Sequence, residues 1–324
     1  MDGMTSLTSK QQTNFEGFPK AAELIEVTGA HALEASDRAL MNTFFQHAHD
    51  SGRLTEPDAE WEISFAHLRQ AQSRHDSNDR LRESLRRIRR VEVRVSYISR
   101  IGEARTYETN LLEFTDTSDD DSLRATIQFG IPKRLRMILA RSNRWGRIRC
   151  EVAYAMTSKY AIALYEMIAL RINMDRCVET IPMEEFREKL GVPPGAYPRA
   201  DNFMRFVITP ALLEVNGLSD LGVQIEMVRK HPRAPAYAVT IAWWRKQGDE
   251  FRAAVQERNR PKVGRMARLK GQVEQLAADK AMLMTDKVAQ ANAEVAGKLE
   301  RMRAEERAKL AAGSSPSSRR PTAI

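Results

Sequence analysis

The chain has 324 residues, of which 42% are hydrophobic and 29% charged, and its formal net charge is +8. This length suits about two domains, no run approaches the roughly 20 apolar residues of a membrane span, and the N-terminus lacks the pattern of a secretory signal. The two cysteines, Cys150 and Cys177, have no metal-site or disulfide spacing. We therefore expect a cytoplasmic protein without membrane contact or cofactor, and the excess of cations suggests a polyanionic partner.

The positive charge is concentrated in two blocks. Seven arginines lie between residues 80 and 94, and seven further bases with no acid lie between residues 133 and 149. A solvated surface usually mixes both signs, so a basic block without acids is better explained as a surface that faces phosphates, and the first block contains only Glu83 and Glu92 against its seven arginines. The candidate contacts in these blocks are Arg80, Arg82, Arg86, Arg87, Arg90, Lys133 and Arg134.

The first half of the chain has the element order of a winged helix. Apolar periodicity predicts three helices followed by a β-hairpin. The expected elements are helices over 40–49, over 65–71 and from residue 78, then strands over 91–98 and 107–114. In the third helix Leu81, Leu85 and Ile88 form the buried stripe, and most of the arginines point away from it.

The same order recurs in the second half. The expected elements are helices over 157–170, 183–190 and 199–216, then strands over 223–228 and 236–242. A Thr-Ser pair begins the first helix and Gly191 ends the second, as caps commonly do. The apolar face expected for the third helix consists of Phe203, Phe206, Val207 and Leu213.

Polar residues near the start of that third helix are suited to reading DNA bases. In helix-turn-helix proteins this part of the second helix reaches into the major groove. Arginine can bind guanine bidentately and asparagine can bind adenine in the same way. The candidate contacts are Arg199, Asn202 and Arg205 on the helix, and Arg229, Lys230 and Arg233 in the basic wing between the strands. Helix pattern alone leaves open the alternative that these are ordinary solvated residues.

Several separated motifs between residues 155 and 216 resemble the iteron-binding plasmid replication initiators. The motifs are Thr157-Ser-Lys-Tyr-Ala-Ile-Ala-Leu-Tyr-Glu, Glu185-Phe-Arg-Glu-Lys-Leu-Gly-Val, Tyr197, Asn202-Phe-Met-Arg-Phe-Val-Ile and Thr209-Pro-Ala-Leu-Leu-Glu-Val-Asn216. The resemblance extends more loosely back to about Leu40, and the chain beyond Trp244 is not covered by it.

The resemblance implies an α+β fold of two tandem winged-helix domains, followed here by a charged C-terminal helix and a disordered tail. It implies that monomers bind directly repeated iterons in double-stranded DNA, whereas homodimers in equilibrium with them repress their own gene. It also implies that the host initiator and the replicative helicase are partners. Residue by residue, it places Thr157, Ser158 and Lys159 on phosphate at a helix N-terminus, and it implies that Pro210 bends its helix without ending it.

These inferences together predict five segments. They are a flexible N-terminus (1–20), a winged-helix domain for dimerisation and DNA contacts (21–145), the main iteron-binding winged-helix domain (146–246), a charged, weakly coiled-coil extension (247–312) and a disordered tail (313–324). The extension is open to three interpretations: an exposed single helix, an oligomerisation arm or a nonspecific DNA tether.

We do not expect an enzyme. His47 and His49 resemble the metal-binding pair of a nicking initiator, but on a helix side chains two residues apart diverge by about 200°. A phosphate-binding loop for ATP is also missing from the sequence. Two other classes compete with the initiator: a winged-helix transcription regulator, and an assembly protein that uses its C-terminal helix as a scaffold.

Overall fold

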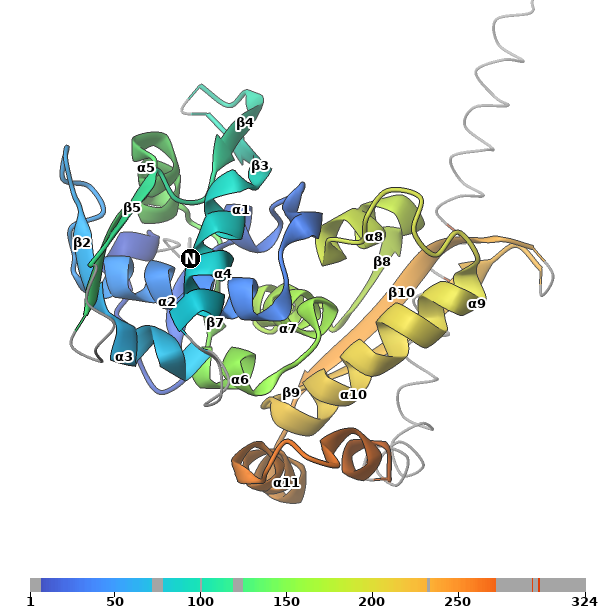
Figure 1. The fold of residues 1–324 in the computed structure, drawn as a ribbon. Coiled ribbons are helices and arrows are strands. Elements are labelled where there is room, and N and C mark those ends of the chain that lie inside the picture. Colours follow the sequence, from blue (N-terminus) through green and yellow to red (C-terminus); the bar gives the residue numbers. More distant parts are fainter. Residues whose placement is uncertain are drawn as a thin grey trace, which may run out of the picture.

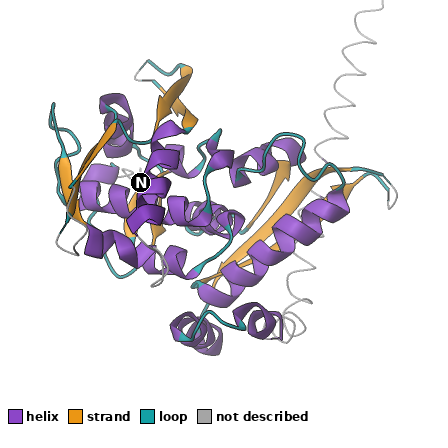
Figure 2. Cartoon of the chain, viewed as in Figure 1, coloured by secondary structure: helices purple, strands orange, loops and turns teal. Residues whose placement is uncertain are grey.

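The computed structural model describes residues 7–71, 78–99, 101–118, 125–231 and 234–271, together with Ala293 and Gly297. It has the predicted α+β architecture of two tandem winged-helix domains (Figures 1 and 2). The predicted tail beyond residue 312 and most of the predicted extension lie outside the described residues.

The first domain contains short strands and helices around a central helix, α2. Its elements are β1 (Phe18–Ala21), α1 (Ala22–Ile25), α2 (Ala35–Asp50), β2 (Trp61–Ser64), α3 (Phe65–Leu68), α4 (Asn78–Arg90), β3 (Glu92–Ile98), β4 (Ala104–Asn110), β5 (Phe114–Thr117), β6 (Thr126–Gly130), α5 (Lys133–Arg141), β7 (Trp145–Ile148) and α6 (Cys150–Ala155), with short 3₁₀ turns η1 (Thr8–Lys10), η2 (Ala30–Ala32) and η3 (Arg69–Ala71). Strand β7 pairs with β1, β2 and β5 flank β6, and β3 pairs with β4.

The predicted hairpin of this domain is correct for its first strand and wrong for the end of its second. Strand β4 stops at Asn110, because Leu111 and Leu112 turn into the core and are almost fully buried. Phe114 then begins β5, which belongs to a different sheet. Two buried leucines in succession cannot both face the core within a strand, since neighbouring side chains point to opposite sides.

The second domain is a three-stranded antiparallel sheet covered by helices. Its elements are β8 (Val178–Pro182), α8 (Met183–Leu190), α9 (Ala200–Phe203), a π-helical turn η4 (Met204–Ile208), α10 (Thr209–Leu218), β9 (Leu221–Arg229), β10 (Ala236–Arg245) and α11 (Gly248–Asn259), and helix α7 (Lys159–Arg171) precedes them. Strand β10 lies between β8 and β9. Ser158 caps α7, and Gly191 ends α8 in the left-handed conformation, φ 74°.

Helix α7 connects the two domains. It packs against α2 and β7 on one side and against α10 on the other. Ile162, Leu164, Tyr165 and Ile168 point in different directions around the helix and are all buried. A helix that is apolar all round is stable only when it is surrounded by protein. Strand β7, which crosses the predicted boundary between residues 145 and 146, likewise pairs with β1.

The helix predicted over 199–216 continues through Pro210, as expected. Proline in a helix clashes with the carbonyl four residues earlier and lacks an N–H donor. In this chain the widened π-helical turn η4 directly precedes Thr209, and Pro210 lies in the first turn of α10. α9, η4 and α10 therefore form one long helix along the sheet (Figure 1).

The beginning of the C-terminal extension packs back onto α10. Leu269 is fully buried, and a side chain at Gly217 of α10 would overlap it. Glu257 of α11 is buried and forms ion pairs with Arg265 and Arg268. The described part of the extension is thus attached to the second domain, whereas most of the predicted coiled-coil stretch, from residue 272 on, lies outside the described residues.

Candidate nucleic-acid interface

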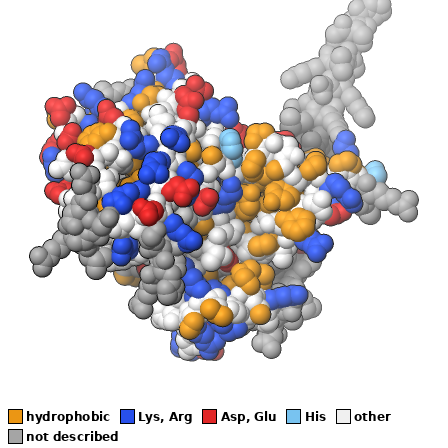
Figure 3. Space-filling view, viewed as in Figure 1, with side chains coloured by type: hydrophobic (Ala, Val, Ile, Leu, Met, Phe, Trp, Pro, Cys, Tyr) orange, Lys and Arg blue, Asp and Glu red, His pale blue; other side chains and the backbone are white. Residues whose placement is uncertain are grey.

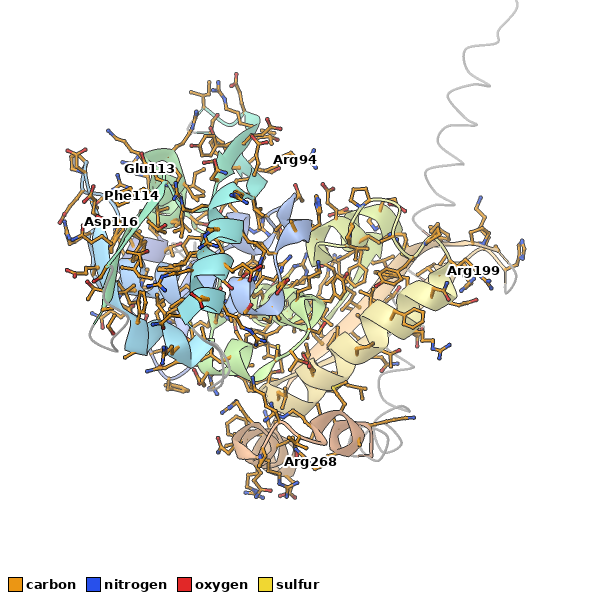
Figure 4. All side chains as sticks on the ribbon, viewed as in Figure 1. Arg94, Glu113, Phe114, Asp116, Arg199 and Arg268 are labelled. Carbon is orange, nitrogen blue, oxygen red and sulfur yellow. The ribbon has the colours of Figure 1, made fainter. Side chains whose placement is uncertain are left out.

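The three predicted base-reading residues are exposed along one end of the long helix. Arg199 precedes α9 and Asn202 lies within it, while Arg205 lies in η4. Figure 4 shows Arg199 at the outer end of this helix, near the end of the β9–β10 hairpin. Phe203 and Val207 anchor the opposite side, since both are fully buried. The structure therefore brings the predicted polar residues together on a solvent-facing surface.

The wing is attached to the start of this helix by Arg229. Its guanidinium lies 3.2 Å from a carboxylate oxygen of Asp201 in α9 and donates a 2.9 Å hydrogen bond to the carbonyl of Ala234. Arg229 therefore fixes the wing relative to the helix and also neutralises an acid on the surface. Lys230 is exposed at the tip of β9, and Arg233 lies outside the described residues.

The N-terminus of α7 is occupied by a carboxylate of the protein itself. The backbone N–H groups of Thr157 and Ser158 each donate a hydrogen bond to Glu214 of α10, at 3.0 Å, and the Thr157 hydroxyl donates a third. Lys159 donates a 2.6 Å hydrogen bond to the carbonyl of His31. These groups are thus already hydrogen-bonded within the protein, and the phosphate contacts of Thr157, Ser158 and Lys159 stay a prediction. A helix N-terminus attracts any anion, and here the anion is buried Glu214.

Helix α4 exposes only part of its arginine cluster. Arg80, Arg86 and Arg90 are exposed, whereas Arg82 is half-buried, with its guanidinium 6.0 Å from the ring centre of Phe65. Arg82 therefore has a packing role in addition to its charge.

Arg87, which was predicted to contact DNA, is bound by acids of the protein. It is bound in two places by the fully buried carboxylate of Asp37, at 2.9 and 3.0 Å, and it also pairs with Glu34 and Glu83. The hydrogen bonds that Arg87 donates to Asp37 are the main reason that the pKa of Arg87 is raised. Arg87 thus joins α4 to α2 and is half-buried, unlike its exposed neighbour Arg86.

The second basic block is also divided between surface and interior. Lys133 and Arg134 are exposed at the start of α5, and together with Arg89, Tyr107 and Asn110 they line a cavity of about 640 Å³. Arg134 donates a 2.9 Å hydrogen bond to the hydroxyl of Tyr97. Three of the residues that line this cavity are cations and one, Glu113, is an acid, and Arg89 belongs to α4.

Two other arginines of this block have structural partners. Arg136 is buried and binds the carbonyls of Ile131, Glu56 and Pro57, and Arg147 binds the carbonyls of Gln12 and Gly17. The expectation that the whole block faces phosphate is therefore wrong for these two residues. Figure 3 shows Lys and Arg gathered over the first domain around α4 and again at the outer end of α9, with a less charged area between them.

The described residues offer no group of three or more His, Cys, Asp and Glu that could hold a metal ion. His49 faces Asp50 and the carbonyl of Thr8. Burial raises the pKa of Cys150 to about 12, so this cysteine is not a reactive thiolate. Within the described part of the chain, no helix is both long and apolar enough to cross a membrane.

Two family models match the chain. The model described as "Initiator Replication protein, WH1" matches residues 19–169, and the model described as "Initiator Rep protein, WH2" matches residues 182–241, so that together they cover more than half of the chain. The chain belongs to the initiator replication protein family.

Two solved structures are similar to this chain, and the first of them has the same fold. A Pi initiator protein in complex with iteron DNA matches with a TM-score of 0.52 and 14% identity, over 71% of this chain and 97% of that one. Domains 2 and 3 of RctB match with a TM-score of 0.42 and 14% identity, over 64% of this chain and 81% of that one. A search of the curated proteins found no match.

Sequence reasoning missed two buried acids beneath this surface and one exposed aromatic residue on it. Asp37 and Glu214 each bind a group that had been predicted to face DNA, and no sequence signal marks a partner that is 50 or more residues away. Phe206 was predicted to lie on the apolar face of its helix, but 51% of it is exposed. Phe206 follows Asn202 by about one helical turn, and Asn202 was expected to face solvent. This spacing could have indicated that Phe206 is exposed as well.

Proposed function

We propose that this protein binds directly repeated sites in double-stranded DNA at a plasmid origin, mainly through its second domain. Occupancy of adjacent repeats would bend and open neighbouring AT-rich DNA and recruit the host initiator and the replicative helicase. A dimer in equilibrium with the monomer would repress the protein's own gene. The chemistry is binding and deformation of DNA, without a catalytic residue or a cofactor.

The observation that carries this proposal is the surface formed by α9, η4 and the wing. Arg199, Asn202 and Arg205 are exposed together, and the contact between Arg229 and Asp201 holds the wing beside them. Such a surface fits a major groove with the wing against the adjacent backbone. The relative with the same fold that was solved with iteron DNA supports repeated sites as the target.

The first domain supplies a second basic surface. The exposed arginines of α4, together with Arg89, Lys133 and Arg134 at the cavity by the start of α5, provide most of its cations. We infer that this surface binds phosphates and contributes affinity that depends on salt.

A winged-helix transcription regulator remains the alternative function, since its contacts with DNA would be the same. The two functions differ in the arrangement of their sites. Several direct repeats beside an AT-rich segment fit the initiator, whereas one inverted repeat at a promoter fits the regulator.

Arg205→Ala is expected to weaken binding to the specific repeat by about 1–3 kcal/mol and to leave binding to random DNA nearly unchanged, because a bidentate contact with a base is lost. The matched control is Lys230→Ala in the wing, which should weaken both DNAs alike and lower the salt slope by about one. Titrations on both DNAs at several salt concentrations measure this. Equal losses on the two DNAs for Arg205→Ala would contradict base reading.

Arg86 and Arg87, which are neighbours on α4, are expected to behave in opposite ways. Arg86→Ala should reduce the affinity for all DNA sequences with little effect on stability, because Arg86 is exposed. Arg87→Ala should lower the free energy of unfolding by about 2 kcal/mol, because it leaves the buried carboxylate of Asp37 without its partner. Denaturant unfolding and DNA titration of both variants separate the two roles, and a stable Arg87→Ala protein with weakened DNA binding would overturn the assignment.

A further inference from the structure

Phe206 is a large apolar side chain exposed on the surface proposed to face DNA bases. Half of it is accessible, at 51%, although it lies in the same helix as fully buried Phe203 and Val207. Phe206 lies four residues, about one helical turn, after Asn202, so the two share a face. A ring at this place is not needed for the core.

The ring is held in position by two neighbours. The ring centroid of Tyr197 lies 6.1 Å away at an interplanar angle of 30°, and the guanidinium of Arg205 lies 5.2 Å from the Phe206 ring centre. Tyr197 has a backbone φ of 51°, a left-handed conformation that is unusual for an aromatic residue. Backbone strain of this kind persists where the surrounding structure requires it and is found preferentially at binding sites.

The chemistry of the major groove offers one apolar target for such a ring. Each A·T pair presents the C5-methyl group of thymine there, beside groups that form hydrogen bonds, and phenylalanine is among the side chains that contact it. Resting on the proposed function, we propose that Phe206 reads a thymine methyl group next to the base contacted by Arg205. The contact between the two side chains would couple the reading of adjacent bases.

Replacing thymine by deoxyuridine tests this contact, because it removes the methyl group and leaves all hydrogen-bonding groups of the base unchanged. The probes are duplexes with one footprinted repeat, in which each thymine is replaced singly. The wild-type protein is expected to lose about 3- to 5-fold in affinity at one or two positions, as the loss of one buried methyl group predicts. In Phe206→Ala this ratio of affinities should fall to about 1 at those positions, while the salt slope stays unchanged.

Phe15→Ala is the matched control, since Phe15 is 84% exposed and lies before β1, outside the proposed interface. It should keep the full wild-type ratio at every position, and thermal unfolding should show that both variants are folded. A ratio in Phe206→Ala equal to that of the wild type would overturn the inference. Loss of cooperativity between adjacent repeats with an unchanged ratio would also overturn it, and would place Phe206 at a contact between protein molecules.

The test separates this inference from the proposed function. A protein that binds the repeat specifically but tolerates deoxyuridine at every position contradicts only the role of Phe206. A protein that distinguishes no repeat from random DNA contradicts the proposed function and, with it, the role of Phe206.

Discussion

Glu166→Ala is expected to lower the free energy of unfolding by about 3–5 kcal/mol, because it leaves a buried cation without its partner. The carboxylate of Glu166 in α7 lies 2.8 Å from the ammonium of Lys20 in β1 and accepts a 2.7 Å hydrogen bond from Asn42 in α2. All three residues are almost completely buried. This network attaches the helix between the domains to the first domain, so urea unfolding should show the loss directly.

The loss of unfolding free energy in Glu166→Ala is expected to become smaller as the pH rises. Burial lowers the pKa of Lys20, although Glu166 acts to raise it. Without Glu166 the pKa of folded Lys20 falls further below the unfolded value of about 10.4. Lys20 then loses its proton at lower pH in the folded variant. The free-energy cost of burying its charge disappears as the pH rises from this lowered pKa toward the unfolded pKa. The difference between variant and wild type should therefore be smaller at pH 10 than at pH 7.

Two controls make this result specific. Glu166→Gln keeps the shape of the side chain and should lose less stability than alanine, whereas Glu184→Ala, at an exposed position of α8, should lose almost none. A Glu166→Ala protein as stable as Glu184→Ala would show that the buried network does not hold the domains together.

Glu214→Ala is expected to cost about 3 kcal/mol of unfolding free energy, since two backbone N–H groups and a hydroxyl lose one shared acceptor. Glu214 connects the helix that continues from α9 to the N-terminus of α7. Its loss should therefore loosen the second domain, and hydrogen exchange at the amides of Thr157 and Ser158 should become faster.

Glu214→Ala also tests whether the N-terminus of α7 can bind an external anion such as a DNA phosphate. With Glu214 removed, this helix N-terminus becomes available to an external anion, so the folded variant should bind DNA at least as well as the wild type at low salt. Thr209→Ala, an exposed change on the same helix, is the control for stability. If Thr157→Ala alone weakened binding to all DNA sequences, these residues would contact phosphate despite the contacts with Glu214.

Local signals in the sequence were sufficient for most of the second domain. The cap at Ser158 and the left-handed Gly191 mark the ends of helices through chemistry within a few residues, and both are confirmed. Strand β1 was not predicted, because it has only four residues and pairs across more than 120 positions, Phe18 with Ile148. A pattern read along the chain contains no information about such a distant partner.

In the candidate site, too, local sequence predicts some features and distant contacts determine the others. Exposure of Arg199, Asn202 and Arg205 follows from helical periodicity and agrees with the structure. Charge alone could not show that Arg87 and Arg136 bind groups inside the protein, because their partners are distant in sequence. Local patterns therefore located the surface, and tertiary contacts decided which of its cations are available.

Footprinting of the purified protein across the DNA that flanks its own gene, at two salt concentrations, tests the central claim most directly. We predict regularly spaced protection of several direct repeats that survives the higher salt and is lost in Arg205→Ala. Protection of one inverted repeat alone would favour the transcription regulator. Diffuse protection that disappears at higher salt would contradict sequence-specific binding through α9 and the wing.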